Sequence, residues 1–410
     1  MSRLVGRVPG LTPGDWAVLR VWLISRVAVL ALSWPATAIL QGGSRSTRPW
    51  LSLWPNWDAL RLQHIAQYGY FEPHGLFQHQ IAFFPGFPLA EAIAHVLVRQ
   101  WTVSGLLVSL IAGAVAAVAL GRIADLDYRP GSGSTAVLYL VAAPAAIFLA
   151  VGYSETLFLA FALTAWLAAR NGRWLAAAVL AGGAGFVRFN GLFLLAALAV
   201  AAIQSPGGWS RGGEERGGSG GEERGGDRGG TGGEDSWKPA GAGPRIRALA
   251  GLLPALIPPL LYELYLKART GDWLAWQHAE YEGWQRTLTN PLDTWRTAWG
   301  AGFGHQFSAP IDFAFQLEIA AVLVGVVAIV LLAWHRRWPE LVYTTLTIGS
   351  LATSIWYESV PRSLLLLWPI WCGLAAAAAR RAWVGQLYLA VSVPIAVSIG
   401  LLFMTGNWAG

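Results

Sequence analysis

Four charged residues of this chain stand at the boundaries of long apolar segments, where ionisable side chains are costly and usually functional. Asp58 ends the sequence WPNWD, Glu155 ends GYSE, and two arginines lie in VRFNG (Arg188) and VPRSL (Arg362). A carboxylate can take a proton from a hydroxyl group as a general base, and a guanidinium fork binds phosphate through two parallel hydrogen bonds. These residue types indicate chemistry in which a hydroxyl group is activated beside a phosphate.

Each of these residues also has a simpler interpretation. Asp58 can be the N-cap of a helix that contains Arg61 and Leu62. Glu155 can complement the dipole at a helix N-terminus, and either arginine can extend to the lipid headgroups. The residues alone leave both interpretations open.

The composition is that of a membrane protein. Of the 410 residues, 55% are hydrophobic and 13% are charged, against about 25% charged in soluble domains. The net charge of +6 comes from Lys and Arg residues that mostly flank apolar runs and form no basic face, so no nucleic-acid partner is expected. The single cysteine, Cys372, excludes an internal disulfide and a cysteine metal cluster.

Apolar runs of roughly 17 to 25 residues, the length that crosses a bilayer, recur along the chain. We expect spans near residues 16–40, 101–121, 135–151, 154–170, 246–266, 313–334, 339–356, 363–379 and 384–404. The stretch 174–203 is one long crossing or two short ones. Two short ones, with Arg188 and Asn190 at the outer turn, put the arginine pairs 336–337 and 380–381 on the inner side. This choice predicts eleven crossings, an inside N-terminus and an outside C-terminus. The first span is expected to be uncleaved, because no small-residue cleavage site of the A-x-A kind follows it immediately.

The organisation has three parts. Residues 1–204 form an N-terminal transmembrane catalytic module, whose first outer loop, 41–100, contains amphipathic pieces at Asp58–Gln67 and Pro85–Val98. Residues 205–245 are rich in Gly, Arg and Glu and predict a disordered cytoplasmic linker. Residues 246–410 form a C-terminal transmembrane module with a second outer loop at 268–312.

Metal and nucleotide sites are not indicated by the motifs. Four of the seven histidines (His64, His74, His79 and His95) lie in the first loop, but their spacing matches no usual ligand pattern and no H-E-x-x-H occurs. The sequence also has no Walker P-loop and no G-x-G-x-x-G at a helix start. We expect no metal and no cofactor.

Five ordered blocks resemble a known family. They are NWDALRLQHIAQYGY (56–70), AFFPGFPL (82–89), the segment GYSETLF to VRFNGLFL (152–194), RTGDWLAWQHAEYEGWQR (269–286) and PRSLLLLWPIW (361–371). In this order they look like the PIG-V type, the second mannosyltransferase of GPI-anchor assembly, and its bacterial relatives.

The resemblance implies an all-α polytopic fold of the GT-C glycosyltransferase type, with a large first extracytoplasmic loop that holds juxtamembrane helices. It implies transfer of mannose from a polyprenyl-phosphate-mannose donor to an extracytoplasmic hydroxyl of a lipid-linked, glycan or protein acceptor. The essential acid of the family maps onto Asp58. The expected location is a bacterial plasma membrane, with membrane lipids as further partners.

The resulting hypothesis is an inverting displacement. Asp58 is the general base, and Arg188 and Arg362 bind the donor phosphate. The residues expected to bind the acceptor or the sugar are Trp57, His64, Glu155, Asn190 and His278, and Glu280 lies near them in the second loop. A polytopic lipid or solute transporter is the alternative, because broken helices and buried charges suit it too; a catalytically silent scaffold is a third interpretation.

Overall fold

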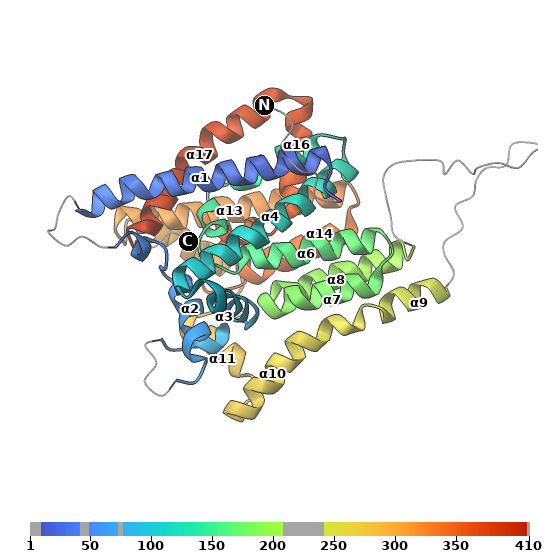
Figure 1. Ribbon diagram of the computed structural model, residues 1–410, viewed down its shortest axis with the longest axis horizontal. Helices are drawn as coiled ribbons and strands as arrows, with labels where there is room; N and C mark the ends of the chain where they lie inside the picture. Colours follow the sequence, from blue (N-terminus) through green and yellow to red (C-terminus); the bar gives the residue numbers. More distant parts are fainter. Residues whose placement is uncertain (1–9, 42–48, 73–76, 208–241, 408–410) are drawn as a thin grey trace, which may run out of the picture.

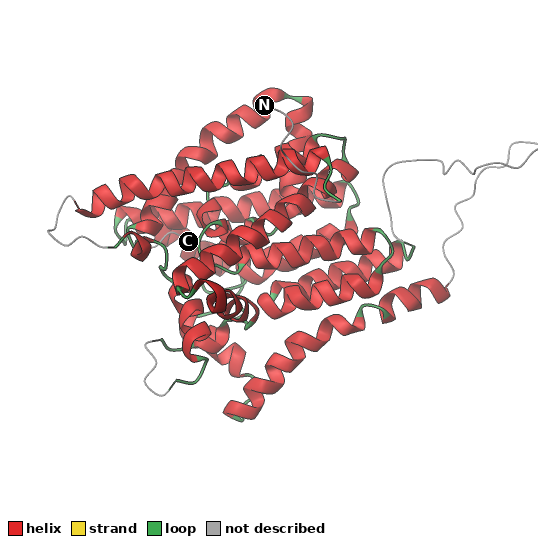
Figure 2. Ribbon diagram, viewed as in Figure 1, coloured by secondary structure: helices red, strands yellow, loops and turns green. Residues whose placement is uncertain are grey.

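The structure is a computed structural model that describes residues 10–41, 49–72, 77–207 and 242–407. Regular secondary structure within these residues is entirely helical (Figure 2). The predicted linker, 205–245, lies mostly outside the described residues, as does His74. The helices of the N-terminal half are α1 (Pro13–Gln41), α2 (Asp58–Tyr68), α3 (Gly86–Val98), α4 (Trp101–Asp127), α5 (Ser132–Val141), α6 (Glu155–Arg170), α7 (Trp174–Val187) and α8 (Asn190–Gln204).

The described part of the C-terminal half is also helical. Its helices are α9 (Ala242–Ala250), α10 (Ile257–Thr270), α11 (Ala275–Trp284), α12 (Pro291–Phe303), α13 (Ala309–Trp334), α14 (Trp338–Ala352), α15 (Val360–Leu364), α16 (Trp368–Arg380) and α17 (Ala382–Met404). Short 3-10 turns join several of them, including one at Gln80–Ala82 in the first loop.

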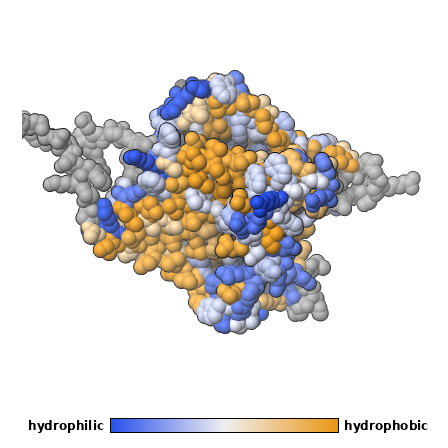
Figure 3. Space-filling model, turned by 180° about the vertical axis from the view of Figure 1, so that it is seen from behind, coloured by the Kyte–Doolittle hydropathy of each residue, from blue (hydrophilic) through white to orange (hydrophobic). Residues whose placement is uncertain are grey.

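Five helical segments are long and apolar enough to cross a bilayer. They are Pro13–Ile39, Trp101–Asp127, Ala242–Thr270, Ala309–Trp334 and Ala382–Met404. Large apolar side chains on them, such as Leu23, Val327 and Trp334, are exposed, and one face of the molecule carries a broad hydrophobic area (Figure 3). Water would oppose such exposure but lipid does not, so the chain is a multi-pass integral membrane protein, as predicted.

The count of eleven crossings is not confirmed. The span expected at 135–151 is only α5, with ten residues, followed by a short turn. Helices α6, α7, α8, α14 and α16 have 13 to 16 residues. At about 1.5 Å per residue they reach about 20 to 24 Å, less than the roughly 30 Å of a hydrocarbon core. Helix length therefore does not define the number of crossings.

The ambiguous stretch 174–203 is two helices, as predicted. Helices α7 and α8 lie side by side (Figure 1) and are separated by Arg188 and Phe189, with Arg188 in an extended conformation. Their backbones meet at two glycines: a Cβ atom added to Gly191 would lie 2.2 Å from the backbone nitrogen of Gly185. Only glycine permits this close approach of the two backbones. The resulting helical hairpin has Arg188 at its tip.

Both loop regions pack at one end of the helix bundle. Helices α2 and α3 agree with the two amphipathic pieces predicted for the first loop, and they lie with α11 at the same end (Figure 1). Trp276 on α11 donates its indole N–H to the carbonyl oxygen of Ala82, and Tyr262 on α10 donates its hydroxyl to that of Ile81. These hydrogen bonds therefore connect the two loop regions at this end of the bundle.

The interior between the helices is packed with rings and small side chains. Trp166 on α6, Tyr343 on α14 and Trp368 on α16 are all fully buried, and the ring of Trp368 lies 4.8 Å from that of Trp166 and 4.7 Å from that of Tyr343. Such contacts hold the central helices in fixed relative positions. This core supports the ends of α6, α7 and α15, which carry the charged residues described next.

Candidate active site

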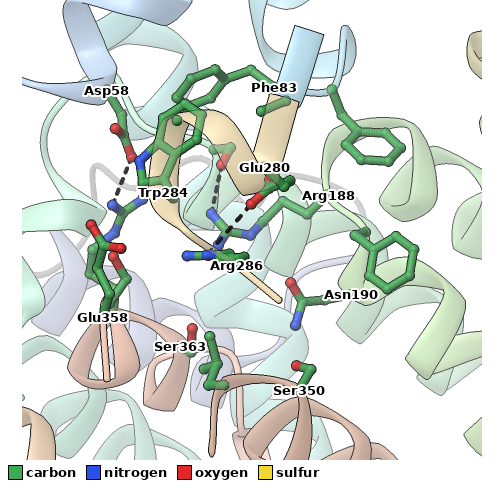
Figure 4. Close-up of a pocket in the computed structure, with 18 of the residues that line it drawn as sticks. Asp58, Phe83, Arg188, Asn190, Glu280, Trp284, Arg286, Ser350, Glu358 and Ser363 are labelled. Atoms are coloured by element: carbon green, nitrogen blue, oxygen red, sulfur yellow. Dashed lines mark hydrogen bonds and ion pairs between the residues drawn. The ribbon is translucent and has the colours of Figure 1, made fainter. Parts of the chain in front are cut away.

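A cavity of about 610 Å³ opens where the two loop regions meet the helix ends. Its charged lining comes from elements that are far apart in sequence. These are α2 (Asp58, Arg61), the α7–α8 break (Arg188), α11 and its end (Glu280, Arg286), and α15 with the segment before it (Glu358, Arg362). Several of these side chains point toward a common space (Figure 4). A volume of about 300 to 1,000 Å³ is usual for a site that binds a small molecule.

Arg362 joins two of the predicted carboxylates. Its Nη1 donates to Oδ2 of Asp58 at 2.7 Å, while its Nε and Nη2 donate to Oε1 of Glu155 at 3.0 and 2.8 Å. The guanidinium also lies over the rings of Phe148 and Tyr153. These three bonds use three of the five N–H groups that arginine carries, and the residue lines the cavity.

Glu155 is the buried centre of this network. Its side chain is 0% exposed, and its Oε1 atom accepts from Arg188 Nη1 at 3.0 Å as well as from Arg362. Arg188 Nη1 donates also to the hydroxyl of Ser154 at 2.8 Å. A buried carboxylate must be paired. Glu155 is paired with both arginines and fixes the positions of their guanidinium groups. It does not line the cavity itself, and its Oε2 has no hydrogen-bond partner within the described residues.

The Asn56-Trp57-Asp58 segment is anchored at every residue. Asn56 donates to the carbonyl oxygen of Phe403, Trp57 donates its indole N–H to that of Asn407, and the hydroxyl of Tyr153 accepts from the backbone N–H of Asp58. Asp58 begins α2, and Trp57, with a positive φ of 53°, is the N-cap residue. The capping interpretation of Asp58 is therefore wrong, and its carboxylate, 20% exposed, faces Arg362 instead.

The second loop contributes side chains of opposite charge to the lining of the cavity. Arg286 Nε lies 3.5 Å from Glu280 Oε2, and the ring of Trp284 lies against the guanidinium of Arg61. Burial raises the pKa of Glu280 and of Glu358, and the Arg286 cation partly opposes both shifts. Burial also lowers the pKa of Arg61, which the nearby Asp58 opposes. The cavity thus has cations and carboxylates on several sides.

Two of the predicted site residues lie elsewhere. The Nδ1 of His64 contacts the Gln80 amide and its Nε2 contacts Glu72, so both ring nitrogens serve packing within the first loop. His278 is exposed and pairs with Asp272. Neither lines the cavity, whereas Trp57 and Asn190 do. The structure thus brings five of the predicted residues together in the lining of one cavity: Trp57, Asp58, Arg188, Asn190 and Arg362. Glu155 lies behind this lining and is bonded to both arginines.

Sequence reasoning missed several residues of the cavity. Arg61 follows Asp58 by three positions and shares its helix face. Arg286 closes the block 269–286, and Glu358 lies four residues before Arg362. A carboxylate inside an apolar run, Glu318 on α13, was a further available signal. No group of three or more metal-ligating side chains is found in the described part of the chain.

These features define a helical, multi-pass membrane protein with a charged cavity at one end of its bundle. Residues 47–205 match the family model described as Mannosyltransferase (PIG-V). The resemblance inferred from the sequence is thereby confirmed over this region, which holds the first three of the five blocks. The blocks at 269–286 and 361–371 lie beyond it.

Relatives of known name match about a third of the chain. The chain is 37% identical over 150 residues to GPI alpha-1,6-mannosyltransferase 2 of Mus musculus, which covers 34% of this chain and 29% of that protein. It is 35% identical over 150 residues to the protein of the same name from Homo sapiens, with 33% and 29% covered. The aligned part therefore spans less than a third of the relatives' length.

Two solved structures are similar over almost the whole chain. ArnT from Cupriavidus metallidurans, bound to undecaprenyl phosphate, has a TM-score of 0.46 and 14% identity, with 94% of this chain and 76% of that chain covered. The archaeal oligosaccharyltransferase AglB from Archaeoglobus fulgidus, in complex with an inhibitory peptide and a dolichol-phosphate, also has a TM-score of 0.46, with 11% identity and coverages of 96% and 56%.

Proposed function

We propose that this chain is a membrane mannosyltransferase of the GT-C type. It moves mannose from a polyprenyl-phosphate-mannose donor to a hydroxyl group of a lipid-linked, glycan or protein acceptor, with inversion and with Asp58 as the general base. The observation that carries the proposal is the Asp58–Arg362 pair at the edge of the cavity, within hydrogen-bond distance at 2.7 Å. The match of residues 47–205 to the PIG-V family supports the choice of sugar.

The reaction is a direct displacement at the anomeric carbon. The acceptor oxygen bonds to that carbon while its proton passes to Asp58. The bond from the carbon to the phosphate oxygen breaks, and its electron pair leaves on the polyprenyl phosphate. A β-linked donor would give an α-mannoside, because the attack comes from the opposite face.

Arg362 can serve both ends of this step. Before transfer it balances the negative charge of Asp58, and it lines the cavity. As Asp58 receives the proton it becomes neutral, while negative charge develops on the leaving phosphate. A fixed cation beside both groups stabilises that redistribution without reorganising. Arg188, held by Glu155 at the cavity wall, is the second phosphate-binding residue.

The rest of the cavity suits a lipid-linked sugar. Phe84, Phe189 and Phe193 line it beside the charged groups and offer an apolar wall to a prenyl chain. Trp57 and Asn190 face the space in which the sugar would lie. We put this end of the bundle on the extracytoplasmic side of a bacterial plasma membrane, because Arg336 and Arg337 flank the opposite helix ends.

The test is mannosyl transfer in isolated membranes supplied with radiolabelled polyprenyl-phosphate mannose. Asp58→Asn should lower transfer by about 100-fold or more, the usual contribution of a general base. Asp293→Asn, which changes an exposed carboxylate on α12, is the matched control and should leave transfer unchanged. Transfer retained by Asp58→Asn would remove the proposed base. Movement of labelled lipid without any transferred sugar, in membranes that hold the unchanged protein, would favour a transporter.

A further inference from the structure

Glu318 is a buried carboxylate inside an otherwise apolar helix. It lies in α13 (Ala309–Trp334), its side chain is 0% exposed, and the helix is among the five long apolar segments. A charged side chain at such a position is expensive and is usually functional. It does not line the cavity, and the transfer mechanism above does not use it.

Both carboxylate oxygens of Glu318 hold the start of α15. The backbone N–H of Ser359 donates to Oε1 and that of Val360 donates to Oε2, each at 2.8 Å. The first N–H groups of any helix lack partners within the helix, and the next residue, Pro361, has none to donate. Glu318 therefore supplies the acceptors that this five-residue helix needs at its beginning.

The segment that Glu318 binds has an unfavourable backbone. Ser359 has a φ of 63°, in the left-handed region that residues other than glycine seldom adopt. Such a conformation persists only where surrounding contacts determine it. Here those contacts include the Glu318 carboxylate and the bond from the Ser363 N–H to the Ser359 carbonyl oxygen, at 3.0 Å.

The held segment carries the central cation of the candidate active site. Arg362 is the third residue of α15, and it reaches Asp58 and Glu155 from there. Glu358, on the other side of Ser359, lines the cavity. One carboxylate in the helix bundle thus fixes the backbone from which two charged side chains of the site project.

We propose that Glu318 is a positioning residue for sugar transfer, which holds α15 so that Arg362 remains bonded to Asp58. This inference rests on the proposed function. The required group is a carboxylate, because two N–H donors need two acceptor oxygens. A glutamine has only one acceptor oxygen, and its NH₂ group would face one of the two backbone N–H donors.

The first test measures transfer. Glu318→Gln should lower kcat by on the order of 100-fold, the cost of a misplacement of about 1 Å at a reacting group, while KM for the donor changes little. Glu318→Asp keeps both oxygens and should restore part of the lost kcat. Asp312→Asn, a buried acid on the same helix, is the control and should retain the parent rate.

The second test separates positioning from general stability. In an Arg362→Lys background, Glu318→Gln should add little further loss, because the bond that it protects is already altered. Simple additivity of the two losses would overturn the inference, as would a full rate for Glu318→Gln alone.

The third test does not depend on activity. Hydrogen–deuterium exchange of a peptide that contains Ser359 and Val360 should be faster in Glu318→Gln than in the parent, with peptides of α4 and α6 unchanged. If the unchanged protein transfers no mannose, the proposed function fails, and exchange alone then decides whether Glu318 holds α15. Unchanged exchange would refute that role.

Discussion

Arg362 donates a 2.7 Å hydrogen bond to Asp58 across 304 positions of sequence. The same guanidinium is bonded through its other two nitrogens to the fully buried Glu155. The proposed base, Asp58, is thus held by a cation that is itself anchored in the helix bundle. Preorganisation of this kind lets a site stabilise developing charge without first moving its own groups.

Replacing the shared arginine should affect both function and stability. Arg362→Lys keeps the positive charge, but a lysine ammonium is compact and cannot reproduce the planar fork that contacts two carboxylates at once. We expect transfer to fall by about 100-fold. Arg362→Ala should in addition cost about 3 kcal/mol of unfolding free energy, since a buried carboxylate loses its partner. Transfer by membranes and thermal unfolding in detergent measure the two effects.

The control for this prediction is an arginine in a pair outside the cavity. Arg296 is exposed on α12 and pairs with Asp293, and surface pairs of this kind contribute little. Arg296→Lys should therefore match the parent in both measurements. Parent-like transfer by Arg362→Lys would show that the fork geometry is not needed.

Arg188 should matter most for binding the donor phosphate. It is held by Ser154 and Glu155 through Nη1 alone, and it faces the cavity (Figure 4). Arg188→Gln should weaken the binding of polyprenyl phosphate by about tenfold, because a hydrogen bond to a charged group contributes about 1.5 kcal/mol or more. Binding of the labelled lipid phosphate to purified protein measures this, with Arg296→Gln as the control. Equal affinity in both variants would assign Arg188 a purely structural role.

The sequence predicted the long apolar helices and the break between α7 and α8, but not the end of α5 at Val141 within the span expected at 135–151. A polar interruption at Arg188 and Asn190 within an apolar stretch predicted two short helices, and the alternation of charge and apolar residues predicted α2 and α3. The number of crossings was not predictable in the same way, because α5 to α8 are shorter than a bilayer and hydropathy does not show how such helices share its thickness.

The site was predictable only in part, because pairing across the chain leaves no local signal. Asp58, Arg188 and Arg362 stood out by their positions beside apolar runs. His64 was also expected to bind the acceptor or the sugar, yet its ring nitrogens contact Gln80 and Glu72. Arg286 became recognisable only when distant segments were seen together, whereas Glu318 had a sequence signal, its place inside an apolar run, that went unused. Residue type shows what a side chain can do, and the packing decides where it acts.

The α7–α8 contact gives a steric prediction. A Cβ on Gly191 would lie 2.2 Å from a backbone nitrogen and 2.3 Å from Cα of Gly185, and neither atom can move without shifting a helix. Gly191→Ala should cost about 2 to 3 kcal/mol of stability and displace the neighbouring Arg188, which lowers transfer. Gly349→Ala is the control, since its Cβ would have no heavy atom within 4 Å. Equal unfolding temperatures for the two variants would contradict the close approach.

The buried acid of the second loop gives a prediction with a definite pH dependence. Burial raises the pKa of Glu280 above its ordinary value of 4.5, although Arg286 lowers it in part, and the side chain is only 16% exposed. The folded protein therefore binds this proton more tightly than the unfolded chain does. The stability that this group contributes is present below pH 4.5, and it is lost as pH rises through the raised folded value. Glu280→Gln removes the titration, so its unfolding temperature relative to the parent should rise over that pH window. A constant difference for Glu280→Gln across the window would mean that Glu280 titrates alike in the folded and unfolded states.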